Sequence, residues 1–310
     1  MKKAEDLRIV FFGTPGFAVA SLAAMVDAGL NIVAVVTAPD KPAGRGMQLR
    51  APEVKEYAVS KGIPVLQPEK LRNTQFLEAL QDYHADLQVV VAFRMLPEVV
   101  WNMPPMGTIN VHASLLPQYR GAAPINWAII NGETETGVTT FKLQHAIDTG
   151  NILLQEKVAI LPEDNIGSLY EKLMLKGGEL LVKTVKGLAE ERIKELPQNN
   201  IPAEELKHAP KIFKEDTHID WNKPVQEIHN LVRGMSPVPA AYTELAGKTA
   251  KIYAGHYTKE PVDKMPGEYD TDMNSYLRFA AKDGWLYVDE LQQEGKKRMD
   301  TIAFLRGFRG

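Results

Sequence analysis

The stretch Leu7–Gly16, LRIVFFGTPG, decides the fold, because a short apolar run leads directly into a turn of glycine, threonine and proline. Such a run is typical of a strand that is buried on both faces of a sheet. The following segment 17–28 has apolar residues at helical spacing, namely Phe17, Leu22, Met25 and Val26. The stretch therefore predicts a strand, a tight turn and a helix, which open a βαβ unit.

The same alternation continues through the first half of the chain. Further strand-like runs cover residues 32–37, 63–66, 87–93 and 108–112, and helix-like segments cover residues 52–60 and 74–83. Apolar strands that alternate with helices indicate a parallel sheet covered on both faces. We therefore expect a doubly wound, mostly parallel α/β sheet, followed by an antiparallel edge strand at 152–160 and a long helix at 166–191.

The second half of the chain has a different character. Prolines and polar residues break the helical period after residue 191, and one helical segment follows at 225–232. Short alternating runs then come at residues 241–245, 249–257, 276–281 and 285–291, separated or interrupted by glycines. This spacing predicts a small β-barrel or sandwich, with Trp285, Tyr287 and Phe304 in its core. The predicted organisation is a catalytic domain at 1–191, a linker at 192–208 and a C-terminal domain at 209–310.

The composition excludes several classes of protein. The 310 residues include no cysteine, which excludes a disulfide scaffold, a thiolate nucleophile and a Cys-ligated metal or iron–sulfur site. The net charge of −3 gives no indication of a nucleic-acid partner, although the tail 296–310 has five basic residues and one acidic residue. No run approaches the roughly 20 apolar residues of a membrane helix, and the N-terminus lacks a signal-like stretch. We expect a cytoplasmic protein.

Two loops at the ends of predicted strands could contact a ligand. Gly13–Gly16 does not match the dinucleotide-binding pattern G-x-G-x-x-G, so it is either a tight turn or a place where backbone approaches a ligand. The loop 40–46, DKPAGRG, is either an ordinary surface loop or an arm that orders over a polyanion. In the second case Lys41 and Arg45 would supply charge-assisted hydrogen bonds.

The segment 109–121, INVHASLLPQYRG, is the densest in residues that can do chemistry. Asn110 and His112 are two apart on a predicted strand and therefore share a face. Their donors could stabilise an oxyanion, although a purely structural role remains open. Asp148, in the sequence HAIDTG, could orient His112 or act as a base through water, or could simply accept backbone hydrogen bonds in a turn.

These segments resemble the formyltransferase family that uses 10-formyltetrahydrofolate, through the patterns N-V-H-x-S-L-L-P-x-Y-R-G and D-T-G. The resemblance covers nearly the whole chain and includes residues 12–15, 42–46 and 219–221. It implies a Rossmann-like formyltransferase fold with an OB-like C-terminal barrel, no metal, and a monomer. It also implies that Asn110, His112 and Asp148 form the catalytic set.

The resemblance further implies where the folate cosubstrate binds. One contacting loop consists of Ser114, Leu115, Leu116 and Pro117. A second loop presents its backbone to the pterin ring and contains Phe93, Arg94, Met95 and Leu96. This second loop departs from the pattern A-Y-G-x-x-L that is common in the tRNA-modifying members. The roles of its side chains therefore stay open.

The P-A-G-R-G loop at 42–46 is most similar to family members that formylate methionyl initiator tRNA for translation initiation. The tRNA contacts that follow from this are Lys41, Arg45, Lys296, Lys297, Arg298, Arg306 and Arg309. The alternative acceptor is a sugar-nucleotide amine, since sugar formyltransferases share the Asn–His–Asp set. A third hypothesis is a nucleotide- or RNA-binding module with a dead active site, against which the intact set argues.

Overall fold

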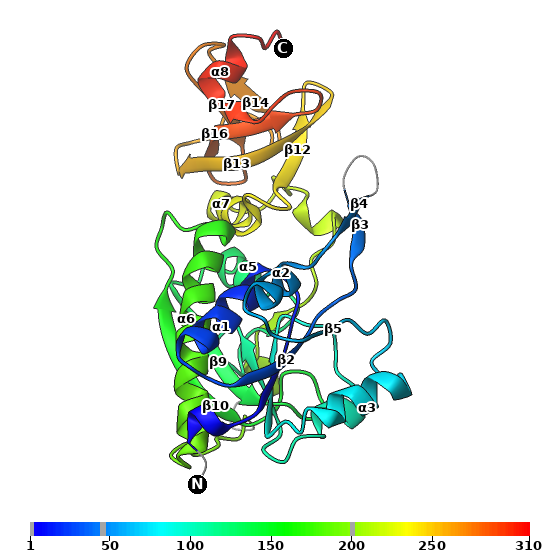
Figure 1. Ribbon diagram of the computed structural model, residues 1–310. Helices are drawn as coiled ribbons and strands as arrows, with labels where there is room; N and C mark the ends of the chain where they lie inside the picture. Colours follow the sequence, from blue (N-terminus) through cyan, green and yellow to red (C-terminus); the bar gives the residue numbers. More distant parts are fainter. Residues whose placement is uncertain (1–2, 44–47, 199–201) are drawn as a thin grey trace. The chain divides into compact units, whose positions relative to one another are not determined.

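The computed structural model describes residues 3–43, 48–198 and 202–310 (Figure 1). The chain forms two compact units. The first unit comprises Met1–Arg120, Gly137–Val158 and Lys172–Lys207, and the second comprises Gly121–Thr136, Ala159–Glu171 and His208–Gly310. Both units therefore contain segments from more than one part of the sequence.

The first unit is built on a seven-stranded sheet with the order β10-β9-β7-β6-β1-β2-β5. Its strands are β1 (Ile9–Gly13), β2 (Ile32–Val36), β5 (Val65–Leu66), β6 (Leu87–Val91), β7 (Thr108–His112), β9 (Glu135–Lys142) and β10 (Ile152–Ala159). The pairs from β5 to β7 are parallel, and β9 is antiparallel to β7. The predicted mostly parallel sheet is confirmed, and β10 lies at its edge.

Helices cover both faces of this sheet. On one face, α3 (Thr74–Asp82) and α4 (Glu98–Trp101) pack against the even-numbered residues of β1 and β6. On the other face, α6 (Ile166–Ala189) lies beside α1 (Gly16–Asp27), and α2 (Glu53–Ser60) packs beside α1 (Figure 1). A Cβ on Gly178 of α6 would be 3.1 Å from the Cβ of Ala24, so glycine lets α6 and α1 approach closely. Among the described residues, no helix has the length and apolarity needed to cross a membrane.

Some elements have no counterpart in the sequence prediction. Strand β9, ETGVTTFK, is buried from residue 136 to 141. Half of those positions are threonines, so the sequence of this core strand lacks the apolar run that would predict it. The predicted loop 40–46 begins as β3 (Lys41–Ala43), which pairs with β4 (Gln48–Arg50). Asp40 anchors its base by an ion pair with Lys55, at 2.7 Å. The proposed tRNA contact Arg45 lies outside the described residues.

The second unit contains a six-stranded antiparallel sheet of order β12-β13-β16-β15-β14, with β17 paired to β16. Its strands are β12 (Ala241–Leu245), β13 (Lys248–Thr258), β14 (Tyr269–Thr271), β15 (Leu277–Ala280), β16 (Trp285–Gln293) and β17 (Met299–Asp300). Register shifts near Ala254 bend β13 against β16, as β-bulges do. The sheet curls into a half-barrel, which is the form that the predicted barrel takes.

The helices of the second unit are α5 (Pro124–Ile130), α7 (Val225–Met235) and α8 (Thr301–Leu305). The remaining short elements of the whole chain, in both units, are η1 (Ala4–Asp6), β8 (Arg120–Gly121), η2 (Ala203–Glu205), β11 (His208–Ala209) and η3 (Glu215–Thr217).

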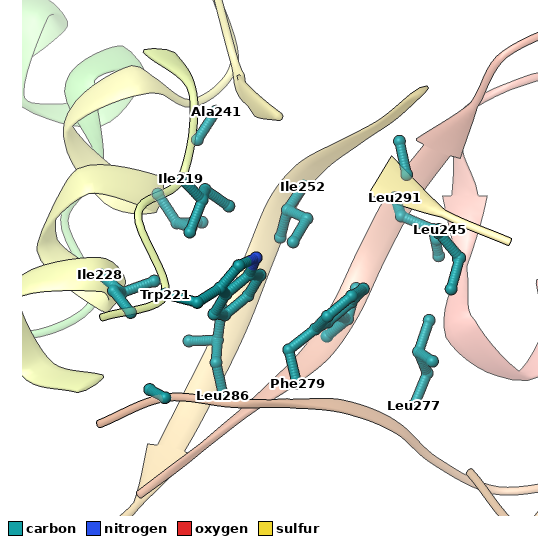
Figure 2. Close-up of a cluster of buried hydrophobic side chains, with 14 of the residues drawn as sticks. Ile219, Trp221, Ile228, Ala241, Leu245, Ile252, Leu277, Phe279, Leu286 and Leu291 are labelled. Atoms are coloured by element: carbon teal, nitrogen blue, oxygen red, sulfur yellow. The ribbon is translucent and has the colours of Figure 1, made fainter. Parts of the chain in front are cut away.

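Trp221 lies at the centre of the core of this unit (Figure 2). Its ring stacks on Phe279 with centroids 4.7 Å apart, and its Nε1 donates to Thr243 Oγ1 at 2.9 Å. Of the three aromatic residues predicted in this core, Phe304 belongs to the cluster. Trp285 is buried outside the cluster, and half-buried Tyr287 stacks on His256 instead. Strand alternation explains the difference, because Trp285 and Tyr287 share the face opposite Leu286 and Val288.

Replacing Trp221 by alanine should destabilise the second unit by about 3–5 kcal/mol, since it removes a buried aromatic side chain and its hydrogen bond. Chemical denaturation followed by circular dichroism measures the loss in the transition of that unit. Trp221→Phe keeps the ring over Phe279 and should cost clearly less. Equal losses for the two variants would show that the stacked ring contributes little.

Candidate active site

Strand β7 places the two predicted catalytic residues at the carboxyl edge of the parallel sheet. Asn110 pairs with Val90 of β6 and with Phe141 of β9, and His112 follows two residues later. Val111, between them, points to the opposite face, where it lies against Gly177 of α6. The alternation of one strand therefore separates residues of the site from residues of the core.

His112 is almost fully buried, with 7% of its surface exposed. Its Nε2 lies 2.8 Å from the carbonyl oxygen of Tyr119, and because a carbonyl only accepts, this nitrogen carries a proton. Its Nδ1 faces Asp148, with 3.9 Å between Nδ1 and Oδ2. Both ring nitrogens of His112 therefore face oxygen atoms.

Asp148 reaches this position from the loop between β9 and β10. Its backbone is left-handed, with φ of 55°, which is unfavourable for a residue with a side chain. The turn that follows requires Gly150, because a Cβ there would lie 1.6 Å from the carbonyl oxygen of Lys142. The D-T-G pattern thus has a structural cause, since only glycine lets the two chain segments approach.

Asn110 carries an unused polar atom. Its Oδ1 is buried and has no hydrogen-bond partner among the described residues. A buried amide oxygen without a partner is costly, because water is lost and nothing replaces it. Such an atom at the sheet edge fits a site that is completed by the donor of a bound molecule.

Backbone strain also occurs around this edge. Three non-glycine residues in three separate loops have left-handed φ angles, and they are Ala92 (48°), Tyr119 (60°) and Asp148 (55°). Each follows or faces the end of β6 or β7. Strained residues persist where the surrounding structure holds them, and they are frequent at functional sites.

The predicted folate loop 114–117 follows directly after β7. Ser114 is fully buried and its hydroxyl donates to the carbonyl of Gln118, while Leu116 packs against Phe141 and Ile152. Leu115 and Pro117 are half-buried. The Ser114 and Leu116 side chains therefore shape the loop from within, and the Leu115 side chain packs against Gly137 of β9. Pro117 and the backbone are left to face a ligand.

The second predicted folate loop follows β6. Phe93 is half-buried and packs edge-on against Phe12, with centroids 5.8 Å apart, and Leu96 is buried. The guanidinium of Arg94 donates to the carbonyls of Pro68 and Glu69. The side chain of Met95 is 72% exposed. Arg94 thus ties this loop to the segment after β5.

The basic residues predicted to contact tRNA are in two regions. Lys41 is exposed on β3 of the first unit, and the tail residues belong to the second unit. Arg298 is already paired with both oxygens of Glu290, at 2.6 and 2.7 Å, which raises its pKa. Lys296 lies over the ring of Phe304. Lys297, Arg306 and Arg309 are exposed, and no acidic side chain in the described part of the chain pairs with them.

The sequence interpretation missed residues that act through backbone or amide groups. Tyr119 contributes its carbonyl, which accepts the proton of His112 Nε2. Only its place in the motif 110–121 indicated that it belongs to the site. Thr139, on the unpredicted strand β9, donates to Ser114 and accepts from the backbone of Leu116. Gln198 donates to the carbonyls of the Asp148 loop, and nothing in its surrounding sequence indicates this role.

Comparisons with known proteins match both halves of the chain. The family model described as "Formyl transferase" matches residues 7–185, and "Formyl transferase, C-terminal domain" matches residues 211–309. A methionyl-tRNA formyltransferase of Parabacteroides distasonis is 54% identical over 100% of this chain and 98% of its own length. That of Bacteroides fragilis is 52% identical over 99% and 97%.

A solved structure shares the fold at low identity. The N-formyltransferase from Helicobacter canadensis, in complex with folinic acid and dTDP-3-aminofucose, superposes with a TM-score of 0.66. It is 22% identical, and the match covers 93% of this chain and 99% of that chain. The family expected from the sequence motifs is thus confirmed by models that match both halves of the chain. The chain belongs to the formyl transferase family.

Proposed function

We propose that this chain transfers a formyl group from 10-formyltetrahydrofolate to the α-amine of methionyl initiator tRNA. The observation that carries the proposal is the juxtaposition of Asn110, His112 and Asp148 at the carboxyl edge of the sheet. The acceptor follows from relatives about half identical over their full length, which are methionyl-tRNA formyltransferases. Sugar formyltransferases of known structure are far less similar in sequence.

The residues present fit a bound formyl donor. When bound, 10-formyltetrahydrofolate supplies the formyl carbonyl that the amine attacks. Asn110 offers an amide at the sheet edge whose buried oxygen receives no hydrogen bond from the described part of the chain. Residues 92–95, of which Phe93 is half-buried and the others are exposed, lie in the loop after β6, and the half-buried Leu115 and Pro117 lie in the loop after β7. These two loops would hold the folate.

The side chains of the site would then act on charge and protons. The Asn110 amide would donate to the oxygen on which negative charge develops, a contribution of about 2.7–4 kcal/mol per donor in comparable sites. Its Oδ1 would accept from the attacking amine. His112 is the second residue that we propose for the oxyanion, and the Tyr119 carbonyl and Asp148 hold its ring in place.

Asp148 has two roles in this proposal. Its carboxylate faces His112 Nδ1 across 3.9 Å, so it favours the ring orientation that the site needs. With 12% of its side chain exposed, it also remains in reach of a water molecule. A proton from the attacking amine would pass to Asp148 directly or through that water, and it would go on to N10 of the folate as the bond between N10 and the formyl carbon breaks.

The acceptor arm of the tRNA would contact exposed basic residues of both units. Lys41 and Arg45 would approach it from the loop after β2, and Lys297, Arg306 and Arg309 would bind phosphates from the C-terminal tail. Such contacts position the RNA and are independent of base sequence. We propose that the enzyme acts as a cytoplasmic monomer.

The direct test is an assay of formyl transfer from 10-formyltetrahydrofolate. We expect formylation of methionine on charged initiator tRNA and none of a dTDP-linked amino sugar. Transfer to the sugar alone would overturn the acceptor. No transfer to either acceptor, by a folded protein, would support a binding module instead.

Removing the side chains of the site should abolish most turnover without unfolding the protein. Asn110→Ala should lower kcat by about 100- to 1000-fold, as the loss of one oxyanion donor does. His112→Ala and Asp148→Asn should each cost about 100- to 10,000-fold. The matched control is His145→Ala, which removes a 75% exposed histidine from the same loop as Asp148 and should change kcat by less than about 3-fold. Near-normal turnover of one folded site variant would remove that residue from the mechanism.

The tail should contribute to tRNA affinity through its uncompensated charges. Lys297→Ala and Arg306→Ala should each raise KM for tRNA, leave KM for folate unchanged, and reduce the salt dependence of binding by about one phosphate contact. Arg298→Ala should have a smaller effect, because Glu290 already neutralises that charge. Steady-state kinetics at several salt concentrations measures all three. An unchanged KM for Lys297→Ala and Arg306→Ala at every salt concentration would exclude the tail from the tRNA site.

A further inference from the structure

A short segment after α6 lies against the loop that carries Asp148. Leu196 and Ile152 exchange two backbone hydrogen bonds, at 2.8 and 2.9 Å. Beside them, Glu195 accepts from Lys142 and Asn151, and these contacts, that with Lys142 first, lower the pKa of its carboxyl. The segment 195–196 therefore contacts both ends of the loop that carries Asp148.

Gln198 ends this segment and is buried, with 9% of its surface exposed. Its Nε2 donates to the carbonyl of Asp148 at 3.0 Å and to that of Gly150 at 2.6 Å. Its Oε1 accepts from Nε and Nη2 of Arg120, at 3.1 and 2.8 Å. Carbonyls only accept and a guanidinium only donates, so these partners fix the orientation of the amide.

These contacts connect the two sides of the catalytic pair. Arg120 directly follows Tyr119, whose carbonyl accepts the proton of His112 Nε2. Gln198 thus joins the backbone that holds His112 to the backbone that holds Asp148. Tyr119 and Asp148 both have left-handed φ angles, so each depends on its surroundings to stay in place.

The chemistry of this position is specific to glutamine. A glutamate would accept from Arg120 but could not donate to the two carbonyls. A lysine would donate but could not accept from Arg120, and would place two cations together. A methionine of similar length would fill the space without any hydrogen bond.

We propose that Gln198 is a positioning residue, which holds the Asp148 carboxylate against His112 by tying the Asp148 loop to Arg120. The proposal rests on the proposed formyl transfer for its kinetic consequence. It concerns the geometry of the site rather than substrate affinity. A small displacement of a catalytic group is enough to lower kcat strongly while binding persists.

The test compares Gln198→Met and Gln198→Glu with the wild-type protein. Both should lower kcat by about 10- to 100-fold, with KM for folate and for tRNA within about 2-fold. Gln198→Glu keeps the acceptor for Arg120, but it loses the donors to the loop and places a negative charge against the two carbonyls. A wild-type kcat for folded Gln198→Glu or Gln198→Met would overturn the proposal.

The matched control is Glu195→Ala, which removes the neighbouring contacts with Lys142 and Asn151 at the same loop and leaves Gln198 in place. Its kcat should stay within about 3-fold of wild type. An equal loss in Glu195→Ala and Gln198→Met would overturn a specific role, because it would indicate general stiffening by the segment.

A crystal structure of Gln198→Met separates this proposal from the proposed function. We expect the distance from His112 Nδ1 to Asp148 Oδ2 to exceed the 3.9 Å of the native site. An unchanged distance and an unchanged left-handed Asp148 would overturn the proposal. This result does not depend on the substrate, whereas a wild-type protein that does not formylate tRNA would refute the proposed function alone.

Discussion

The alternation of side chains along β7 is the constraint on which the site depends. The strand lies between β6 and β9, so its odd residues are enclosed by helices while Asn110 and His112 come to the opposite face. A shift of register by one residue would bury the polar pair under α6 and bring Val111 to the edge. Strand β9 runs antiparallel to β7 and ends beside Ile109, so the loop that follows β9 starts at the other end of β7 and must return along the strand to bring Asp148 to His112. One strand and its neighbour thus place all three residues.

This geometry depends on backbone conformations that the chain does not favour on its own. Left-handed residues cost of order 1–3 kcal/mol each, and three of them border the sheet edge. The structure holds them with contacts that extend away from the site. Gly150 permits close approach to Lys142, Arg94 binds the loop after β5, and Gln198 binds the Asp148 loop. The site is therefore organised by residues that need not touch a substrate.

The sequence was most informative where burial and periodicity coincide. The parallel strands, the flanking helices and the pairing of Asn110 with His112 on one face followed from apolar runs and strand alternation. Strand β9 could not be predicted in the same way, because threonines occupy its buried positions. The contacts of Tyr119 and Gln198 could not be predicted either. Every residue has a backbone carbonyl, so the sequence does not indicate which carbonyl accepts a hydrogen bond. A single glutamine between prolines is typical of a loop and indicates no particular contact. In the second unit, apolarity correctly predicted burial for Trp285 but could not indicate which face of the sheet it lies on.

We propose that the formyl group is transferred at the carboxyl end of β7. A crystal structure of the protein with 5-formyltetrahydrofolate, a stable analogue of the donor, tests this most directly. We expect a pterin against the backbone of residues 92–95 and a formyl-bearing edge beside Asn110, with His112 and Asp148 still adjacent. A folate bound elsewhere, with Asn110 Oδ1 still unpartnered, would contradict it.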